Sequence, residues 1–510
     1  MNRLKWFRRT MGILVLLGML AVLAWFFLPV RQPTEKQLLS LVPADATAVI
    51  VQHDLVRRGH ELENSRFIKA CCESTLMPMQ FGGDSRAQRA GRQALLDLLG
   101  DRFVVFLVPG ANRETVGGAC VLAPITWRSK WVWVRAMLIQ YLRAGGFHVR
   151  DNQIDGHLIH EIQTQSPLRL RYAMRDGVLA LACDRSGDSL AALFRAPASQ
   201  PSFPLPLPQN DTESLQLGSW RQPVGTSTWR LSTPGHGTFR FDLTVPKQRS
   251  VRQPWDATRN ERTMGLIQKM FPDPGVLASR GRASHWMAAW DNLVAWLGMS
   301  PDMFCENLLA RTKYQEHLSH GQFPWSGAGD EFALLIAPSE NNAPNPLPTI
   351  TLALRCWETN DTQVAAEQFL PSLASASGAR FRLAPSASDQ PGFTVWMETA
   401  QNSRPLFSYR YVDGLVIAST STESLWKFDV AKFEGQTLET RQPENELECR
   451  AEQLAAALEA LDAVNQIAGN DFADANLKSV AHILKTLAEL RLTIQVDEKE
   501  VRYRCEIREL

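Results

Sequence analysis

Two histidine pairs are the first residues whose type and spacing could support chemistry, because imidazole nitrogens bind metal ions. His157 and His160 lie three apart in a segment that reads as a strand, where they would point to opposite faces, so joint ligation is not expected. His317 and His320, beside Glu316, would share a face if their segment is helical. No further ligand type accompanies them, so we interpret this segment as a solvated helix end. The sequence predicts no metal and no other cofactor.

Four aspartates recur in two repeated motifs and are the next candidates for catalysis. Asp101 and Asp330 follow a glycine, and Asp176 and Asp413 precede one. Asp-Gly and Gly-Asp are typical of turns, because aspartate bonds its own backbone and tolerates the left-handed conformation. We therefore interpret all four as turn residues. The sequence also lacks a Gly-x-Ser-x-Gly elbow, a phosphate-binding loop and a dinucleotide fingerprint, so we expect no catalytic residue and no enzyme.

The eight cysteines include no Cys-x-x-Cys pair, so neither a zinc knuckle nor a thioredoxin-like site is indicated. Four of them, Cys120, Cys183, Cys356 and Cys505, fall in apolar strands and are interpreted as buried thiols. One disulfide, Cys449–Cys505, is left open because both residues lie towards the end of the chain.

The 20 residues 11–30 contain no charged side chain and could cross a bilayer as a helix, since about 20 apolar residues suffice. The basic tail of residues 1–10 predicts that the N-terminus stays in the cytoplasm and that the rest of the chain is extracytoplasmic. The expected location is the inner membrane of a bacterium, with the bulk in the periplasm. A cleaved signal peptide is the alternative, although its apolar region would be longer than usual.

Two motifs recur in the same order and predict a duplicated module. A Gly-Asp turn feeds a buried strand at 100–109 and again at 329–338. An Asp-Gly hairpin follows at 172–182 and again at 409–418. We expect the first module at 40–245, with a proline-rich loop at 197–210, a basic linker at 246–271 and the second module at 272–510.

Residues 284–298 form the clearest amphipathic helix, with Trp286 and Trp290 on its apolar stripe. Core packing is the simpler interpretation of that stripe, and a ligand groove lined by these two tryptophans is the alternative. Residues 451–463 and 474–490 also read as helices. The predicted fold class is α+β: a transmembrane helix, then two related modules of antiparallel or mixed sheet with packed helices.

The segment Leu41-Val42-Pro43-Ala44-Asp45-Ala46-Thr47-Ala48-Val49-Ile50 follows the anchor closely. Together with the two repeated motifs, it resembles a family of bacterial envelope proteins with an N-terminal anchor and a duplicated domain of unknown function. Here a valine stands between the leucine and the proline of the family's Leu-Pro-Ala-Asp start. The resemblance implies the envelope location but supplies no activity and no catalytic residues.

The formal charge of +1 argues against a nucleic-acid partner bound through bulk positive charge. The sequence favours a non-catalytic protein that binds a ligand or partner, with the bilayer contacted through residues 11–30 and an envelope protein or lipid as possible partners. An envelope hydrolase with an unrecognised site and a carrier of lipid or another apolar ligand are the alternatives.

Overall fold

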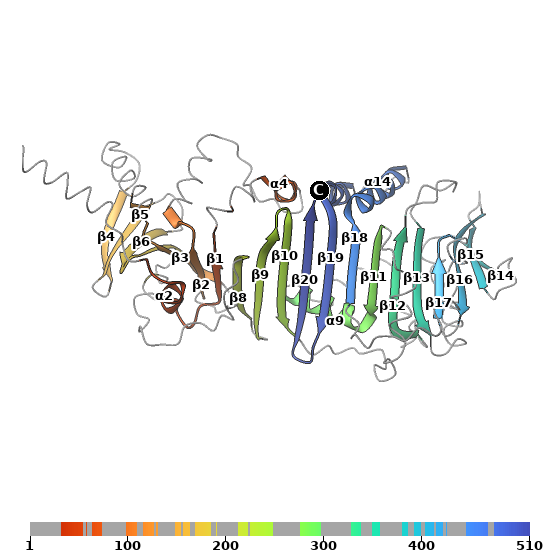
Figure 1. Cartoon of the computed structure of the whole chain (residues 1–510), viewed down its shortest axis with the longest axis horizontal. Helices are drawn as coiled ribbons and strands as arrows, with labels where there is room; N and C mark the ends of the chain where they lie inside the picture. Colours follow the sequence, from red (N-terminus) through yellow and green to blue (C-terminus); the bar gives the residue numbers. More distant parts are fainter. Residues whose placement is uncertain are drawn as a thin grey trace, which may run out of the picture. The chain divides into compact units, whose positions relative to one another are not determined.

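The computed structural model (Figure 1) describes the following parts of the chain: residues 32–54, 58, 64–73, 98–109, 116–126, 129–130, 148–154, 157–163, 169–184, 190, 213–222, 225–247, 276–296, 328–337, 349–356, 380–385, 392–398, 403–412, 415–421, 425, 445–467 and 474–510.

Antiparallel strands dominate the described residues, which corrects the α+β fold predicted from the sequence. Twenty strands belong to one 20-stranded hydrogen-bonded sheet. The described helices are few: α2 (Glu35–Ser40), α4 (Arg66–Glu73), α9 (Ala283–Trp296), α14 (Ala451–Ile467) and α15 (Asp474–Leu484). The prediction failed because several strands, such as HVRDNQI at 148–154, are largely polar and show neither the alternation nor the β-branched run that identifies a strand in sequence.

The predicted transmembrane segment, residues 11–30, lies outside the described residues. Among those that are described, no helix is both long enough and apolar enough to cross a membrane.

The chain divides into two compact units, of which unit 1 comprises residues 1–64 and 80–232. Its strands pair antiparallel in the order β4-β5-β6-β7-β3-β2-β1-β8-β9. Their bounds are β1 Ala48–Gln52, β2 Phe103–Pro109, β3 Val116–Pro124, β4 His148–Ile154, β5 His157–Gln163, β6 Arg169–Arg175, β7 Val178–Asp184, β8 Ser214–Gln222 and β9 Gly225–Gly235.

Unit 2 comprises residues 65–79 and 233–510. Its strands pair antiparallel in the order β14-β15-β16-β17-β13-β12-β11-β18-β19-β20-β10, and Figure 1 shows β20 between β19 and β10. Their bounds are β10 Thr238–Pro246, β11 Leu277–Arg282, β12 Ala328–Ala337, β13 Thr349–Cys356, β14 Arg380–Pro385, β15 Gly392–Glu398, β16 Ser403–Val412, β17 Leu415–Ser419, β18 Asn445–Arg450, β19 Leu487–Val496 and β20 Glu500–Glu509.

The strands β1–β9 of unit 1 and the strands β11–β19 of unit 2 pair in the same order, if β1 is matched with β11, β2 with β12, and so on. The unit boundary falls at residue 232, inside β9, so β10 is grouped with unit 2 although it precedes the predicted linker. The module boundaries predicted from the repeated motifs, 40–245 and 272–510, stay a prediction.

The core of unit 1 lies where α2 covers one face of the sheet. Thr34 caps this helix, and a capping box with Gln37 completes its first turn. Leu38 and Leu39 are buried in a cluster with Phe106 of β2 and further apolar residues of β1, β3 and β7. Fully burying two such leucines stabilises the fold by roughly 3–6 kcal/mol, which fixes a helix too short to be stable alone.

The core of unit 2 lies where α14 and α15 pack against β19, through Ala455, Leu484 and Leu487. Helix α9 contacts the same sheet face further along, because the Tyr503 hydroxyl on β20 donates a hydrogen bond to the backbone oxygen of Ala289. Neighbouring residues of a strand point to opposite faces, so the face that carries Arg504 is the one opposite these helices.

Candidate functional site

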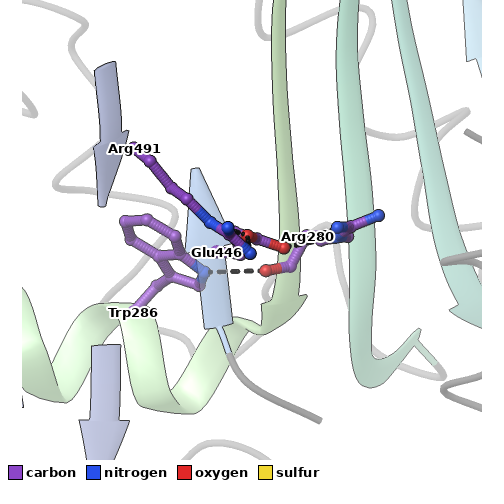
Figure 2. Close-up of polar contacts among 4 residues, drawn as sticks. All are labelled: Arg280, Trp286, Glu446 and Arg491. Atoms are coloured by element: carbon purple, nitrogen blue, oxygen red, sulfur yellow. Dashed lines mark hydrogen bonds and ion pairs between the residues drawn. The ribbon is translucent and has the colours of Figure 1, made fainter. Parts of the chain in front are cut away.

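In the described part of unit 2, one carboxylate is held between two arginines (Figure 2). Glu446 on β18 accepts hydrogen bonds from Arg280 Nε on β11, at 3.1 Å, and from Arg491 on β19. The cross-strand register explains the first contact, because Arg280 lies directly opposite Glu446. Only 10% of the Glu446 side chain is exposed, whereas Arg491 is 48% exposed. We call Glu446, Arg280 and Arg491 together the clamp. Its glutamate is nearly buried, and its Arg491 reaches solvent.

The electrostatics of the clamp keep Glu446 ionised. Burial alone would raise the pKa of Glu446, but the hydrogen bonds and charges of Arg280 and Arg491 outweigh it and lower the pKa below its ordinary value. The neighbouring Glu448 responds in the opposite direction: burial and the charges of Glu446 and Glu489 raise its pKa. A carboxylate with a lowered pKa is a poor proton donor or acceptor near neutral pH, so Glu446 is suited to holding arginines in place.

The charges continue from the clamp across the sheet. Arg491 lies opposite Glu506 of β20, and Glu506 accepts a 2.8 Å hydrogen bond from Arg240 Nε of β10. Two residues further along these strands, on the same face, Arg504 Nε donates a 2.7 Å hydrogen bond to Asp242. We call this surface the charged face; it consists of Arg240, Asp242, Arg280, Glu446, Arg491, Arg504 and Glu506.

Unit 1 contains a different cluster, which is buried. Arg171 Nε on β6 donates a 3.0 Å hydrogen bond to Glu161 on β5, and Arg171 Nη1 lies 3.6 Å from Asp184 Oδ1 on β7. The Arg171 side chain is 7% exposed and that of Asp184 only 1%. Asn152 on β4 also donates to Glu161, at 3.4 Å. One arginine and two acids are therefore largely removed from water together, and the contacts between opposite charges offset much of the cost of burying them.

A third cluster lies at one end of β1 and β2. Glu35, in the first turn of α2, lies 3.6 Å from His53 Nδ1 and 3.9 Å from Arg102 Nε. Burial lowers the pKa of His53, and the charge of Arg102 adds to this effect while that of Glu35 opposes it. The cluster joins the start of α2 to the sheet end.

The two tryptophans proposed as a ligand groove both lie on α9. The Trp286 indole donates a 3.4 Å hydrogen bond to the backbone oxygen of Arg280 and meets Phe332 of β12 edge to face, with ring centroids 6.5 Å apart. Trp290 is 43% exposed. The contacts of Trp286 are those of a packed side chain, while the ligand groove stays a prediction.

The aspartate motifs differ in where the structure places them. Asp176 and Gly177 form the turn between β6 and β7, both with positive φ (50° and 82°), as the turn interpretation requires. Asp101 is exposed and follows Gly100, whose φ is also positive (73°). Asp330 does not lie in a turn, because β12 begins two residues before it. Asp413 lies outside the described residues.

The first histidine pair lies in β5, as predicted. His160 stacks on Tyr172 of β6, with ring centroids 4.7 Å apart. Residues 316–320 lie outside the described residues. Within the described part of the chain, no group of three or more His, Cys, Asp or Glu side chains could hold a metal ion, and the expected absence of a cofactor stays a prediction.

Cys449 and Cys505 are free thiols, so the disulfide left open from the sequence is not present. Their strands, β18 and β20, are both paired to β19, which lies between them and holds the two cysteines about 10 Å apart, beyond disulfide reach. Burial raises the thiol pKa to about 11 for each of them. Burial, with a smaller effect of Asp184, also raises the pKa of Cys120. These thiols are therefore poor nucleophiles at neutral pH.

Sequence reasoning missed all three charge clusters. The segments ELECR in β18 and VRYRCEIR in β20 alternate charged residues with less polar ones, and RLTIQV in β19 alternates polar and apolar residues. This alternation signals one polar sheet face. It does not reveal which strands become neighbours, and the pairing decides which arginine meets which glutamate.

Comparison with known proteins adds no relative: no family model, no curated protein and no solved structure matches the chain.

Proposed function

We propose that the chain is a non-catalytic envelope protein, anchored in a bacterial inner membrane by residues 11–30, that binds a partner through the charged face of unit 2. The observation that carries the binding role is the charged face itself. Five neighbouring strands, β11, β18, β19, β20 and β10, place alternating arginines and acids on the sheet face opposite the helices.

The charged face suits recognition because its groups are held in place before a partner arrives. Each acid on it is fixed by at least one arginine, yet Arg491 and Arg504 remain about half exposed, at 48% and 55%. Preorganised guanidinium groups lose little freedom on binding and recognise carboxylates and phosphates with directional hydrogen bonds. A partner of mixed charge, such as another envelope protein, fits this surface better than a purely anionic polymer.

The state of the ionisable groups supports binding over catalysis. The lowered pKa of Glu446 and the raised pKa values of Cys449 and Cys505 remove these groups from acid-base and nucleophilic chemistry at neutral pH.

The binding role is tested by photo-crosslinking in living cells. A photoreactive amino acid replaces Arg504 on the charged face, or, as the matched control, exposed Gln453 on α14. We expect a discrete adduct from position 504 and none from position 453. Adducts of equal yield from both positions, or none from position 504, would contradict the proposal.

The anchor is tested separately with an alkaline phosphatase or green fluorescent protein fused after Leu510. The proposal predicts an active phosphatase, a dark fluorescent protein and a full-length chain that resists alkaline extraction of membranes. A fluorescent C-terminal fusion would place the bulk of the chain in the cytoplasm and overturn the location.

A further inference from the structure

The first described residues tie α2 to one end of the sheet of unit 1. Thr34 is extended (φ −69°, ψ 158°), and its backbone N–H donates to the side chain of Gln37. Pro33 before it has a fixed φ. The chain therefore enters α2 through an extended residue at Thr34. Glu35, His53 and Arg102 lie at this end, which we call the proximal end.

The opposite end of the same strands is equally well defined. Ala44 accepts a 3.0 Å hydrogen bond from Arg221, and Thr47 bonds Leu107 through both its backbone N–H and its hydroxyl. Thr47 and His53 flank β1 on its two sides, so this distal end lies roughly 20 Å from the proximal end at about 3.3 Å per residue.

The spacing between the anchor and α2 limits how far the proximal end can lie from a membrane. Four residues, 31–34, separate Val30 from Glu35. Even fully extended, these five steps cover at most about 18 Å. The headgroup region of a bilayer leaflet is itself roughly 5–8 Å deep, so a substantial part of that length is spent within it.

We infer that the proximal end of unit 1 rests on the phospholipid headgroup surface, with the strands β1 and β2 directed away from the membrane. This inference depends on the proposed anchor of residues 11–30. The docked α2 transmits the position of the anchor to the sheet, because Leu38 and Leu39 are buried and Glu35 lies beside both His53 and Arg102.

The charges at the proximal end indicate that the short connection, not electrostatic attraction, holds it there. Among the described residues at or beside this end, the cations are Lys36, Arg58 and Arg102, and the acids are Glu35, Asp54, Asp101 and Glu213. Because these charges nearly cancel, replacing anionic lipid by zwitterionic lipid should leave the orientation unchanged.

Two exposed aspartates provide a matched pair of probes, Asp101 at the proximal end and Asp45 at the distal end. A fluorescent amino acid replaces one of them at a time in the full-length chain, reconstituted in nanodiscs whose lipid headgroups carry an energy-transfer acceptor. We expect the transfer efficiency to be about twofold higher from position 101, given the separation of roughly 20 Å. Equal transfer, or higher transfer from position 45, would overturn the inference.

A flexible Gly-Ser insertion of about twelve residues between Arg31 and Gln32 serves as the control, since it removes the distance limit. It should abolish the difference between the two positions. If the insertion leaves a strong difference, the orientation does not come from the connection and the inference fails. A full-length chain that does not enter nanodiscs at all contradicts the proposed anchor instead, so the two failures are distinguishable.

Discussion

The same place in the strand order of the two units carries two different chemistries. In unit 1, the register aligns Glu161, Arg171, Ala182 and Cys120 across β5, β6, β7 and β3. In unit 2, it aligns Thr394, Ser408, Ser419 and Thr351 across β15, β16, β17 and β13. We call these the ion row and the hydroxyl row.

The hydroxyl row is made of hydrogen bonds between neutral side chains. The hydroxyl oxygens of Thr394 and Ser408 lie 2.9 Å apart, and those of Thr351 and Ser419 lie 3.0 Å apart. All four side chains are buried. In the ion row, Arg171 instead contacts Glu161 of the same row and Asp184, which lies two residues beyond Ala182 on β7. Net hydrogen bonds between hydroxyls contribute about 1 kcal/mol each, whereas a buried charge that loses its partner costs several times more.

This difference shows that antiparallel strand pairing does not determine whether a buried row of side chains is charged or neutral. Both kinds of row are compatible with the sheet if each polar group has a hydrogen-bond or ion-pair partner. The two rows should therefore differ most in their response to the loss of one member.

Removal of the central arginine is expected to have the largest effect. Arg171→Ala leaves Glu161 and Asp184 buried without their cation, and unfolding of unit 1 should become easier by about 3–5 kcal/mol. Urea unfolding, followed by hydrogen exchange of the β5–β7 peptides, measures this. Arg169→Ala is the control: its side chain is 54% exposed and 3.9 Å from Glu161, so a change below about 1 kcal/mol is expected.

Removing all three charges of the cluster tests whether charge imbalance is the cause. The variant Glu161→Gln, Arg171→Met, Asp184→Asn keeps similar volumes and should unfold within about 2 kcal/mol of the parent chain. A triple variant as unstable as Arg171→Ala would mean that shape, and not charge, determines the cost.

The clamp on the charged face gives unit 2 its own acid sensitivity. Glu446→Gln should destabilise β18 and β19 by about 2 kcal/mol at pH 7, because hydrogen bonds to charged groups are lost, in part to solvent-exposed Arg491. The folded-state pKa of Glu446 is lowered, so its contribution is present above the unfolded value of roughly 4.3 and disappears as the pH falls through the folded value. Glu448, with a raised pKa, acts in the opposite sense.

Unfolding of the parent and of Glu446→Gln at a series of pH values checks this. The gap between the two chains should narrow steadily below about pH 4.5. A gap that stays constant down to pH 2 would show that Glu446 does not act through its charge.

Single losses from the hydroxyl row should cost less than those from the ion row. Ser419→Ala leaves the Thr351 hydroxyl buried without its partner and should destabilise unit 2 by about 1–2 kcal/mol. The double variant Thr351→Val, Ser419→Ala removes both hydroxyls and should recover most of that loss. Thermal unfolding of the variants measures this. A double variant that loses more stability than the two single substitutions added together would refute the prediction.

The smallest effect is expected at the exposed ion pair of the charged face. Asp242→Asn weakens the contact with Arg504, which is 55% exposed, and should change stability by about 0.5 kcal/mol or less. Raising the salt concentration should erase even this difference. A loss above about 1.5 kcal/mol in a urea titration would mean that the pair is far better shielded than its exposure indicates.

The local features of the fold were the ones within reach of sequence reasoning. The Asp176-Gly177 turn was identified correctly, because both residues adopt the positive φ that this dipeptide favours. The amphipathic pattern at 284–298 corresponds to α9, which spans Ala283–Trp296. Both signals depend only on residues close together in the chain.

Features that depend on distant residues were missed or mistaken. The extent of the sheet was not recognised, since strands such as β4 and β14 have short and partly polar sequences. The clamp joins Arg280 to Glu446, 166 residues away, and no local pattern encodes that pairing. Cys449 and Cys505 both lie towards the end of the chain, but β19 lies between their strands, β18 and β20, and separates the two thiols.

Hydrogen exchange of the full chain carrying either Arg171→Ala or Ser419→Ala tests the comparison most directly. The account predicts that Arg171→Ala accelerates exchange strongly in β5, β6, β7 and β3, by a factor of roughly 100 or more for about 3 kcal/mol, while Ser419→Ala accelerates β13 and β17 by less than about 30-fold. Equal acceleration by the two substitutions would contradict it, because the ion row and the hydroxyl row would then be energetically alike.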